Sequence, residues 1–556
     1  MKVNVKHLGA ALLSMALAVT TVVPGGAAAT AAKAPAMAKK SVSVNVRSVT
    51  TIKLKNVNKK AKVAWSSKSK KIAKITKASK TSAKVKGMKK GTTKVTAKYS
   101  LGKVKKTLTC KVKVKAANVK ATPAPANDVP AATATTAPTV TPAATASATA
   151  APSTEATASP TATPDPTEAP FGWTSTWGTA EEPVENQDGV KEFIPLAGTT
   201  VRQIIKVTTT GDKFRLRLSN QYGKSAVKID SIHVAKQGAK ADKSDIDVST
   251  DTVVTYKGAE SFEIPAGEVI QTDEIDFKVN ALENVAVTSF FGDQVPTTGV
   301  TGHRGARATT YQVQGNEVSA EKLDTLSGYK TCTGWFFIAD ASVWMRGGKA
   351  VVCFGDSITD GYGTDASYLG KKPDSYTRWG DYFAKRLQNN EATKNVSVIN
   401  EGIGGNSIFG GLGPAGRTRF ERDLSEHDNV AYCIILFGVN DMNSLKDTSM
   451  WDKMKPEYEK MIETCHDYNV KVYAAPILPF GSSSYYSEGS EEVRNLINNW
   501  FRSDESGVDG IIDFDKAVMD PNNPTRILEA YTHEDGLHPY DGYEAMAEAI
   551  DLNMFK

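Results

Sequence analysis

Residues 117–170 contain almost nothing but Ala, Thr, Pro and Ser. Large apolar side chains are too few there to offset the conformational entropy that a folded core would cost. The stretch therefore predicts an extended, semi-stiff linker. The chain must fold as separate parts on either side of it, which suits a length of 556 residues, too many for a single core.

The first residues have the pattern of an export signal. Lys2 and Lys6 precede the apolar run "LGAALLSMALAVTTVV", and the small residues "AAATAA" follow it. This order predicts a secretory signal peptide over residues 1–31. The run is short for a bilayer span and no other stretch comes close, so we expect a secreted protein without a transmembrane segment after cleavage. An uncleaved membrane anchor is the alternative.

The charge of the chain divides near residue 120. Residues 39–120 contain 27 Lys or Arg and no Asp or Glu. All 61 acidic residues follow, with only 38 of the 68 basic ones, so residues 121–556 carry a formal charge of −23. A basic part so free of acid predicts attachment to an anionic polymer of the cell envelope, and hence the cell wall as the location. A charged spacer without a ligand is the alternative. Nucleic acid is not expected as a partner, because aromatic residues are sparse among the lysines.

Short alternating strands are predicted between residues 41 and 116, in "SVSVNV", "KVAWSS", "AKVKGM", "TKVTAKYS" and "LTCKVKVK". We expect a small antiparallel sandwich with lysines on its solvent faces. The segments "VAWSSKSKKIAKI", "VKGMKKGTTKVTAKY" and "CKVKV" resemble bacterial group 2 immunoglobulin-like domains of exported proteins. The resemblance implies an Ig-like domain over residues 41–116.

The rest of the chain changes its pattern at about residue 347. Residues 171–346 alternate as strands broken by Gly, Asn and Pro, which predicts a jelly-roll-like β domain. Residues 347–556 contain the apolar runs "AVVCF", "VSVIN", "VAYCIILF", "VKVYAAPI" and "GIIDF", typical of strands buried on both faces of a parallel sheet. Helical patterns such as "RWGDYFAKRL", "PEYEKMIETCHDY" and "SEEVRNLINNWFR" alternate with them. The alternation predicts a doubly wound α/β domain over 347–556.

Neither a disulfide scaffold nor a metal centre is expected. The chain has five cysteines, two of them inside apolar runs, where a free cysteine behaves as a small hydrophobic residue. No CxxC pair, HExxH motif or His/Cys cluster is present. We therefore expect no metal and no cofactor.

Polar residues and glycines follow the predicted strands of the last domain. Ser357 comes directly after the first strand, Gly405 after the second and Asn440 after the third. A loop after the last strand carries Asp535 and His538 in "DGLHP". Functional groups of such sheets collect at the carboxyl ends of the strands, so we expect these five residues to lie together.

These residue types are the parts that acyl transfer requires. A serine hydroxyl attacks only when a histidine accepts its proton, and a carboxylate fixes the tautomer of that histidine. The backbone N–H groups of Ser357 and Gly405 and the side-chain amide of Asn440 could stabilise the oxyanion. Each motif alone has an ordinary explanation, as a helix cap, a glycine turn, an Asx turn or a loop histidine. Their order along the chain favours the catalytic interpretation.

Three other polar residues receive minor roles. Asp356 is expected to hold the turn before Ser357 rather than to react. The spacing of His533 does not fit the acid–x–x–histidine pattern. For His303, in "TGHRG", a cap on a loop is preferred to a place in the cleft.

The four blocks "GDSITDG", "GIGGNS", "GVND" and "DGLHP" resemble those of the SGNH (GDSL-type) hydrolase superfamily. The resemblance implies a flavodoxin-like sheet, a triad of Ser357, His538 and Asp535, and oxyanion donors at Ser357, Gly405 and Asn440. The segments "WTSTWGTA", "VRQIIKV", "FRLRLSNQYG" and "GVTGHRGARATTY" also look like the β domain that precedes some secreted members, including esterases associated with xylan degradation.

The sequence thus predicts a secreted serine esterase that removes acyl groups, preferably acetyl, from plant or wall polysaccharide through an acyl-serine intermediate. A lysophospholipase or short-chain lipase is the alternative enzyme, although no long apolar lid or amphipathic membrane helix is evident. A non-catalytic surface-binding protein is the alternative of another class, which the full set of catalytic residue types argues against.

Overall fold

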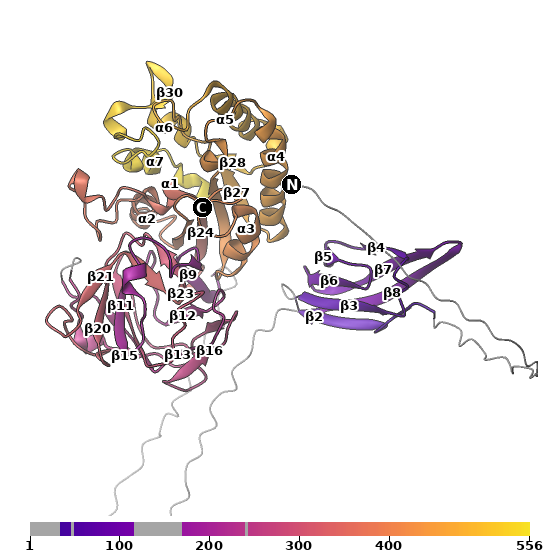
Figure 1. Ribbon diagram of the computed structural model, residues 1–556, viewed down its shortest axis with the longest axis horizontal. Coiled ribbons are helices and arrows are strands. Elements are labelled where there is room, and N and C mark those ends of the chain that lie inside the picture. Colours follow the sequence, from indigo (N-terminus) through magenta and orange to yellow (C-terminus); the bar gives the residue numbers. More distant parts are fainter. Residues whose placement is uncertain (1–33, 46–48, 116–168, 240–242) are drawn as a thin grey trace, which may run out of the picture. The chain divides into compact units, whose positions relative to one another are not determined.

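The computed structural model describes residues 34–45, 49–115, 169–239 and 243–556 (Figure 1). The predicted signal peptide and all of the predicted linker except its last two residues lie outside these ranges. The chain divides into two compact units, residues 1–154 and 155–556, which are described separately. No helix in the described ranges is long and apolar enough to cross a bilayer.

The first unit contains two sheets that share one core. One sheet has the strand order β1-β3-β6-β5 and the other β2-β8-β7-β4. Ile52 and Val85 of the first sheet and Val95 and Val112 of the second belong to the same buried cluster. The strands are β1 (Ala36–Met37), β2 (Ser41–Asn45), β3 (Val49–Lys55), β4 (Lys62–Ser67), β5 (Ala73–Ala78), β6 (Ser82–Gly87), β7 (Gly91–Leu101) and β8 (Val104–Lys115).

One strand pair of this unit departs from the predicted antiparallel arrangement. β2 and β8 run parallel, with Ser41 opposite Lys111 and Asn45 opposite Lys115. The two strands come from opposite ends of the described unit, so no hairpin turn forces them to be antiparallel. The prediction of a wholly antiparallel sandwich is therefore wrong at this pair, and the Ig-like assignment stays a prediction.

Residues 169–346 form a mostly antiparallel β domain in the second unit. A sheet of order β15-β14-β18-β11-β20-β21 and a sheet of order β17-β12-β23-β9 contribute to one buried core, and two smaller sheets accompany them. The jelly-roll assignment stays a prediction. The strands are β9 (Phe171–Gly178), β10 (Glu182–Pro183), β11 (Thr199–Lys206), β12 (Phe214–Ser219), β13 (Val227–Ile229), β14 (Ser231–Lys236), β15 (Thr252–Val253), β16 (Phe262–Ile264), β17 (Val269–Gln271), β18 (Asn284–Phe291), β19 (Thr301–Arg304), β20 (Thr310–Gln314), β21 (Lys330–Cys332), β22 (Gly334–Phe336) and β23 (Ile338–Arg346).

The predicted parallel sheet of the last domain is confirmed. Its order is β25-β24-β26-β27-β28, and every neighbouring pair is parallel. Relative to the domain this is the order 2-1-3-4-5, one of the two common doubly wound orders. The elements are β24 (Lys349–Gly355), α1 (Ser357–Asp360), α2 (Trp379–Gln388), β25 (Val396–Gly402), α3 (Gly416–Ser425), β26 (Val430–Leu436), α4 (Ser449–Asp467), β27 (Lys471–Ala474), α5 (Glu488–Phe501), β28 (Gly510–Ile511), α6 (Phe514–Val518), β29 (Met519–Asp520), β30 (Asn523–Ile527) and α7 (Tyr543–Glu548).

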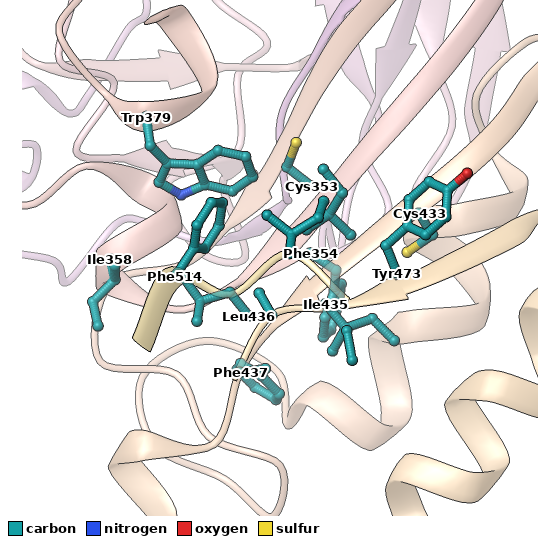
Figure 2. Close-up of a cluster of buried hydrophobic side chains, with 14 of the residues drawn as sticks. Cys353, Phe354, Ile358, Trp379, Cys433, Ile435, Leu436, Phe437, Tyr473 and Phe514 are labelled. Atoms are coloured by element: carbon teal, nitrogen blue, oxygen red, sulfur yellow. The ribbon is translucent and has the colours of Figure 1, made fainter. Parts of the chain in front are cut away.

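The core of this domain lies on both faces of the parallel sheet. Figure 2 shows Phe354 of β24 among side chains of neighbouring strands, with Trp379 of α2 packed against Phe514 of α6. Cys353 and Cys433 belong to this cluster, and all five cysteines of the chain are buried and unbridged. The apolar runs are thus explained by burial of the strands on both sides.

The β domain covers an edge of the parallel sheet. β25 is the edge strand beside β24, and Thr179, just after β9, forms a parallel bridge with Asn400 of β25. The Ser397 hydroxyl donates to the carbonyl oxygen of Ser175 at 2.5 Å. These contacts occupy backbone and side-chain groups at the edge strand, which would otherwise be unpaired.

A buried histidine joins the two domains. His427, after α3, contacts Asp340 of β23 through Nδ1 and Glu401 of β25 through Nε2, each at 2.8 Å. Burial by itself would lower the pKa of His427, but these two carboxylates raise it to about 10. These two contacts favour the protonated side chain, which lies between one carboxyl group of each domain.

Candidate active site

Ser357 is the first residue of the short helix α1, directly beyond the end of β24. The N-cap is Asp356, whose carboxylate accepts a hydrogen bond from the N–H of Ile358 at 3.1 Å. Asp356 therefore holds the strand-to-helix turn, as expected. Burial raises its pKa to about 7.

A hydrogen-bonded chain connects Ser357, His538 and Asp535. The distance between Ser357 Oγ and His538 Nε2 is 2.8 Å, and that between His538 Nδ1 and Asp535 Oδ2 is 2.6 Å. The second carboxylate oxygen, Oδ1, accepts from the backbone N–H groups of Leu537 and His538 at 2.9 and 3.1 Å. One turn of chain therefore fixes the carboxylate and aligns the imidazole with the serine.

The environment of Asp535 keeps it ionised. Partial burial alone would raise the pKa of this carboxyl, but the hydrogen bond to His538 and that from the Tyr540 hydroxyl, at 2.6 Å, hold the pKa well below its usual range. A carboxylate in this position selects the tautomer of His538 that carries hydrogen on Nδ1, which leaves Nε2 as the acceptor toward Ser357.

Gly405 and Asn440 bring hydrogen-bond donors to the same place. Gly405, in the loop after β25, has φ +72°, a conformation that favours glycine. Asn440 lies in a 3₁₀ turn (Val439–Met442) after β26; its Nδ2 donates to the carbonyl oxygen of Asn406 at 2.8 Å, and its Oδ1 accepts from the Tyr485 hydroxyl at 3.3 Å. One hydrogen of the amide thus stays available for a ligand.

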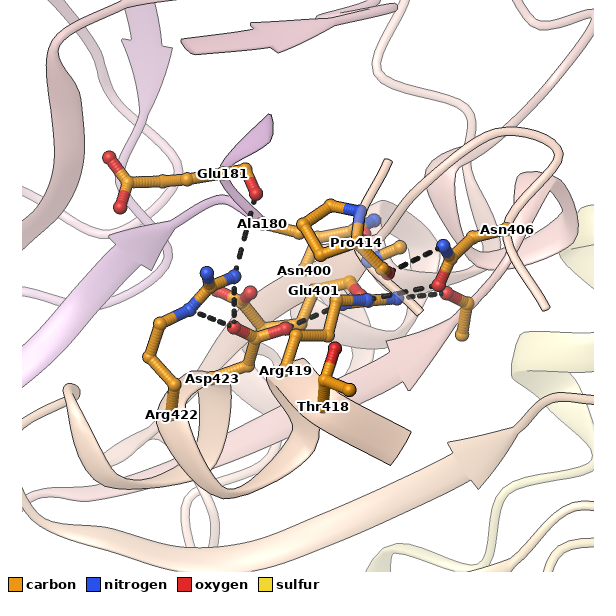
Figure 3. Close-up of polar contacts among 12 residues, drawn as sticks. Ala180, Glu181, Asn400, Glu401, Asn406, Pro414, Thr418, Arg419, Arg422 and Asp423 are labelled. Carbon is orange, nitrogen blue, oxygen red and sulfur yellow. Dashed lines mark hydrogen bonds and ion pairs between the residues drawn. The ribbon is translucent and has the colours of Figure 1, made fainter. Parts of the chain in front are cut away.

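A buried arginine holds the loops that carry these groups (Figure 3). Arg419 of α3 donates to the carbonyl oxygen of Gly355 at the end of β24 and to that of Glu401 in β25, at 2.8 and 2.9 Å. Its Nε donates to Asn406 Oδ1 at 3.0 Å, and it pairs with Asp423 at 2.6 Å. Arg419 therefore ties together the carboxyl ends of two strands and the loop beside Gly405.

Four of the five predicted residues, Ser357, Gly405, Asn440 and His538, line one cavity of about 400 Å³. Asp535 lies behind His538. The remaining wall is mixed, with the aromatic and apolar side chains of Tyr362, Tyr485, Leu412 and Leu537 beside charged groups.

The β domain supplies part of this wall. Asp188, Arg304, Gly305, Arg307 and Thr333 all line the cavity. The cavity is therefore built by both domains of the second unit.

Two residues of the β domain, His303 and Arg307, contact the helix that begins at Ser357. His303 Nε2 lies 3.0 Å from Asp360 Oδ1, and Arg307 Nη2 lies 2.7 Å from Asp360 Oδ2. His303 is buried within β19, so the expectation that it caps a loop is wrong. It lies between the domains because Asp360, at the end of α1, offers it a buried carboxylate.

The sequence profile of the GDSL-like Lipase/Acylhydrolase family matches residues 353–544. These residues are a GDSL-like lipase/acylhydrolase domain. With this domain the chain is a serine hydrolase that acts on ester bonds. Among curated proteins, none matches the chain.

Several solved structures are similar to about a third of the chain. A carbohydrate acetylesterase from Sinorhizobium meliloti is 18% identical and has a TM-score of 0.29, with 36% of this chain and 95% of that chain covered. An acetyl xylan esterase is 25% identical, with a TM-score of 0.28 and coverage of 36% and 96%. A GDSL-like lipase from Bacteroides thetaiotaomicron is 19% identical, with a TM-score of 0.27 and coverage of 36% and 84%.

The sequence did not predict the residues that orient the catalytic side chains around the cavity. Tyr485 and Tyr540 orient Asn440 and Asp535, and neither stands at a recognisable spacing from its partner. Arg304 and Arg307 stand in "GHRGAR", where nothing in the sequence distinguishes them from arginines exposed to solvent. His533 contacts Asp541 at 3.1 Å rather than Ser357.

Proposed function

We propose that the chain hydrolyses carboxylic esters through an acyl-Ser357 intermediate, with His538 as general base and acid and Asp535 as its orienting carboxylate. The observation that carries the proposal is the chain of 2.8 and 2.6 Å contacts from Ser357 through His538 to Asp535, which opens into a cavity with donors from Gly405 and Asn440. Neither a metal nor a cofactor takes part in this scheme.

In the first half-reaction, Ser357 Oγ attacks the ester carbonyl carbon while His538 Nε2 accepts its proton. The carbonyl oxygen becomes an oxyanion. The N–H groups of Ser357 and Gly405 and the free hydrogen of the Asn440 amide stabilise it, because they are fixed before the charge develops. The imidazolium then gives its proton to the departing alcohol oxygen, and the acyl group stays on Ser357.

In the second half-reaction, water replaces the alcohol. His538 Nε2 takes a proton from the water as its oxygen attacks the acyl carbon, and the same donors hold the second oxyanion. Collapse breaks the bond to Ser357 Oγ, which recovers its proton from His538. The products are a carboxylic acid and the free enzyme.

For the substrate we propose a small acyl group, acetyl above all, on a polysaccharide hydroxyl. The cavity of about 400 Å³ is lined by Asp188, Arg304, Arg307 and Asp360 as well as by aromatic residues. Charged groups suit a hydroxyl-rich alcohol, whereas a long acyl chain needs a continuous apolar channel. The polar wall from the β domain supports a polysaccharide over the alternative lysophospholipid or short-chain triglyceride.

Turnover of a panel of esters tests this choice. The full chain should hydrolyse acetylated xylan and p-nitrophenyl acetate with higher kcat/KM than longer p-nitrophenyl esters or a lysophospholipid, and Ser357→Ala should abolish each activity. Preference for long acyl chains would favour the lipase alternative. Absence of turnover on every ester would favour the non-catalytic surface-binding protein.

We also propose that the protein is exported and stays on the cell wall through its first unit, which would bind an anionic envelope polymer. The sheet β2-β8-β7-β4 supports this. Lys94 of β7 lies directly opposite Lys111 of β8, and residues 34–115 contain no acidic side chain. Like charges directly opposite each other destabilise a sheet, and an anionic ligand would relieve that repulsion.

The outer face of this sheet offers a polyanion a regular set of donors. Hydroxyl groups alternate with the lysines, as at Thr92 opposite Lys113 and Thr107 opposite Lys98. A face that carries one sign of charge over several strands attracts a polymer with repeated phosphate or carboxylate groups. The exposed lysines on these strands' outer positions are Lys62, Lys94, Lys98, Lys105, Lys111, Lys113 and Lys115.

A further inference from the structure

One peptide group of the candidate oxyanion site is held from the β domain. Arg304 is the last residue of β19, and its Nη2 donates to the carbonyl oxygen of Gly404. Its Nε donates to Glu182 Oε1 at 3.2 Å, and the Glu182 side chain is fully buried. A buried carboxylate of the β domain therefore fixes the guanidinium of Arg304 through Nε, and Nη2 of the same group contacts the GDSL domain.

The carbonyl that Arg304 contacts belongs to the same peptide group as the N–H of Gly405. A trans peptide group is planar, and its C=O and N–H point in opposite directions. A carbonyl held toward Arg304 therefore turns the Gly405 N–H away from the β domain. Among the described residues this N–H donates to no protein group, and Gly405 lines the cavity together with Ser357.

The orientation of this peptide group is not fixed by its own residues, because both are glycines. Without side chains, Gly404 and Gly405 restrict the rotation of the peptide between them very little. A Cβ built on Gly404 would lie 3.9 Å from Arg304 Nη2 and 3.4 Å from Asp360 Oδ2, which are ordinary contact distances, so what this glycine contributes is freedom of the backbone and not space for Arg304. A charged donor on the carbonyl oxygen both fixes the orientation of the peptide and polarises its N–H.

We propose that Arg304 is a positioning residue of the ester hydrolysis: it orients and polarises the Gly404–Gly405 peptide so that the Gly405 N–H faces the developing oxyanion. This inference rests on the proposed function. It makes the β domain a part of the catalytic apparatus, because the GDSL domain alone lacks the group that fixes one of its oxyanion donors.

The test is the kinetics of the full chain with Arg304→Gln and Arg304→Lys on p-nitrophenyl acetate. For Arg304→Gln we expect kcat to fall by about ten- to a hundredfold, the range that loss of a hydrogen bond from a charged group corresponds to. KM should change much less, because the donor acts mainly when charge develops. Arg304→Lys should lose less, since it keeps a positive donor.

The matched control is Arg215→Gln. Arg215 also links the β domain to the GDSL domain, through Asp428 at 2.6 Å, but it does not line the cavity. Its loss should leave kcat within about twofold of the original. A further readout is Arg304→Ala with added millimolar guanidinium, which should restore part of kcat if a guanidinium on the Gly404 carbonyl is what the reaction needs.

Three results would overturn the inference: an unchanged kcat in Arg304→Gln, an equal loss in Arg215→Gln, or a rise of KM alone. The last would make Arg304 a substrate-binding residue. Labelling by a fluorophosphonate separates this failure from failure of the proposed function, because a working serine enzyme is labelled at Ser357 whatever the role of Arg304. Should Arg304→Gln not fold, the Lys variant and the guanidinium response decide the question.

Discussion

Replacement of Asn440 by alanine should slow the chemical step far more than it weakens substrate binding. The Asn440 amide has two hydrogens, and one already donates to the Asn406 carbonyl oxygen at 2.8 Å. Alanine at this position removes the second hydrogen, which is one of the three donors proposed to face the oxyanion. Loss of one such donor costs roughly 3 to 4 kcal/mol of transition-state stabilisation, or about a hundred- to a thousandfold in kcat.

Tyr485→Phe is the control for this prediction. It leaves the Asn440 donor in place and removes only the 3.3 Å hydrogen bond that orients the amide. A neutral hydrogen bond contributes about 0.5 to 1.5 kcal/mol, so kcat should fall by about tenfold or less. Initial rates on p-nitrophenyl acetate over a range of concentrations separate kcat from KM. The reasoning is refuted if Asn440→Ala raises KM with kcat unchanged, or if Tyr485→Phe costs as much as Asn440→Ala.

Three other predictions follow from the geometry. Gly405→Ala should lower kcat, because φ is +72° and the new Cβ would lie 2.8 Å from Leu412. Gly410→Ala, in the same loop, is the control: its Cβ meets nothing within 4 Å, so steady-state kcat and KM should not change. His427→Gln should lower the free energy of unfolding by about 3 to 5 kcal/mol, since it leaves two buried carboxylates without their cation. Because the folded-state pKa of His427, about 10, exceeds its ordinary 6.5, its contribution to the free energy of unfolding declines as the pH rises from about 6.5 to 10. Burial also raises the pKa of its partner Glu401, to about 7, so that carboxyl adds a titration of its own near neutral pH. Urea unfolding at several pH values should show the decline toward pH 10 in the original chain and a smaller one in His427→Gln. Four Lys→Gln changes on the outer face of β7 and β8, at Lys94, Lys98, Lys111 and Lys113, should reduce salt-sensitive binding of the full chain to purified cell walls. Four changes at exposed lysines outside that sheet, Lys53, Lys55, Lys59 and Lys60, should not. Equal losses would mean that net charge alone matters.

The parts of the fold that were predictable are those whose signal is local. Five apolar runs corresponded to the five strands of the parallel sheet, because a strand buried on both faces must be apolar throughout. The residues at the ends of those strands could be expected to meet because parallel strands present their carboxyl ends at one edge. Ser357, Gly405 and Asn440 line one cavity for this reason.

The parts that were not predictable depend on burial of polar groups. Helix α3 was missed because Arg419, fully buried in its middle, has the appearance of a solvent-facing residue in a sequence. Helix α4 begins at Ser449, seven residues before Pro456, where the pattern predicted its start. Its buried face, which includes Met454 and Tyr458, offsets the hydrogen bond that the proline removes.

The contacts between the β domain and the GDSL domain could not be predicted from periodic patterns in the sequence. Arg304 reaches Gly404 across a hundred residues, and the His303–Asp360 pair joins a β strand of one domain to a helix of the other. Such pairs depend on how two folded domains meet, which neither spacing nor composition encodes. A β domain before the hydrolase domain could therefore be predicted, but not its role as a supplier of groups that hold the loops of the site.

The most direct test of the central claim is the identity of the residue that forms a covalent bond with an ester-like probe. The full chain treated with a fluorophosphonate should gain one adduct, located on Ser357 by mass spectrometry of its peptides, with loss of esterase activity in the same proportion. His538→Ala should slow the labelling by orders of magnitude, because the serine then lacks its proton acceptor. An adduct at another residue, or undiminished turnover by Ser357→Ala, would contradict the account.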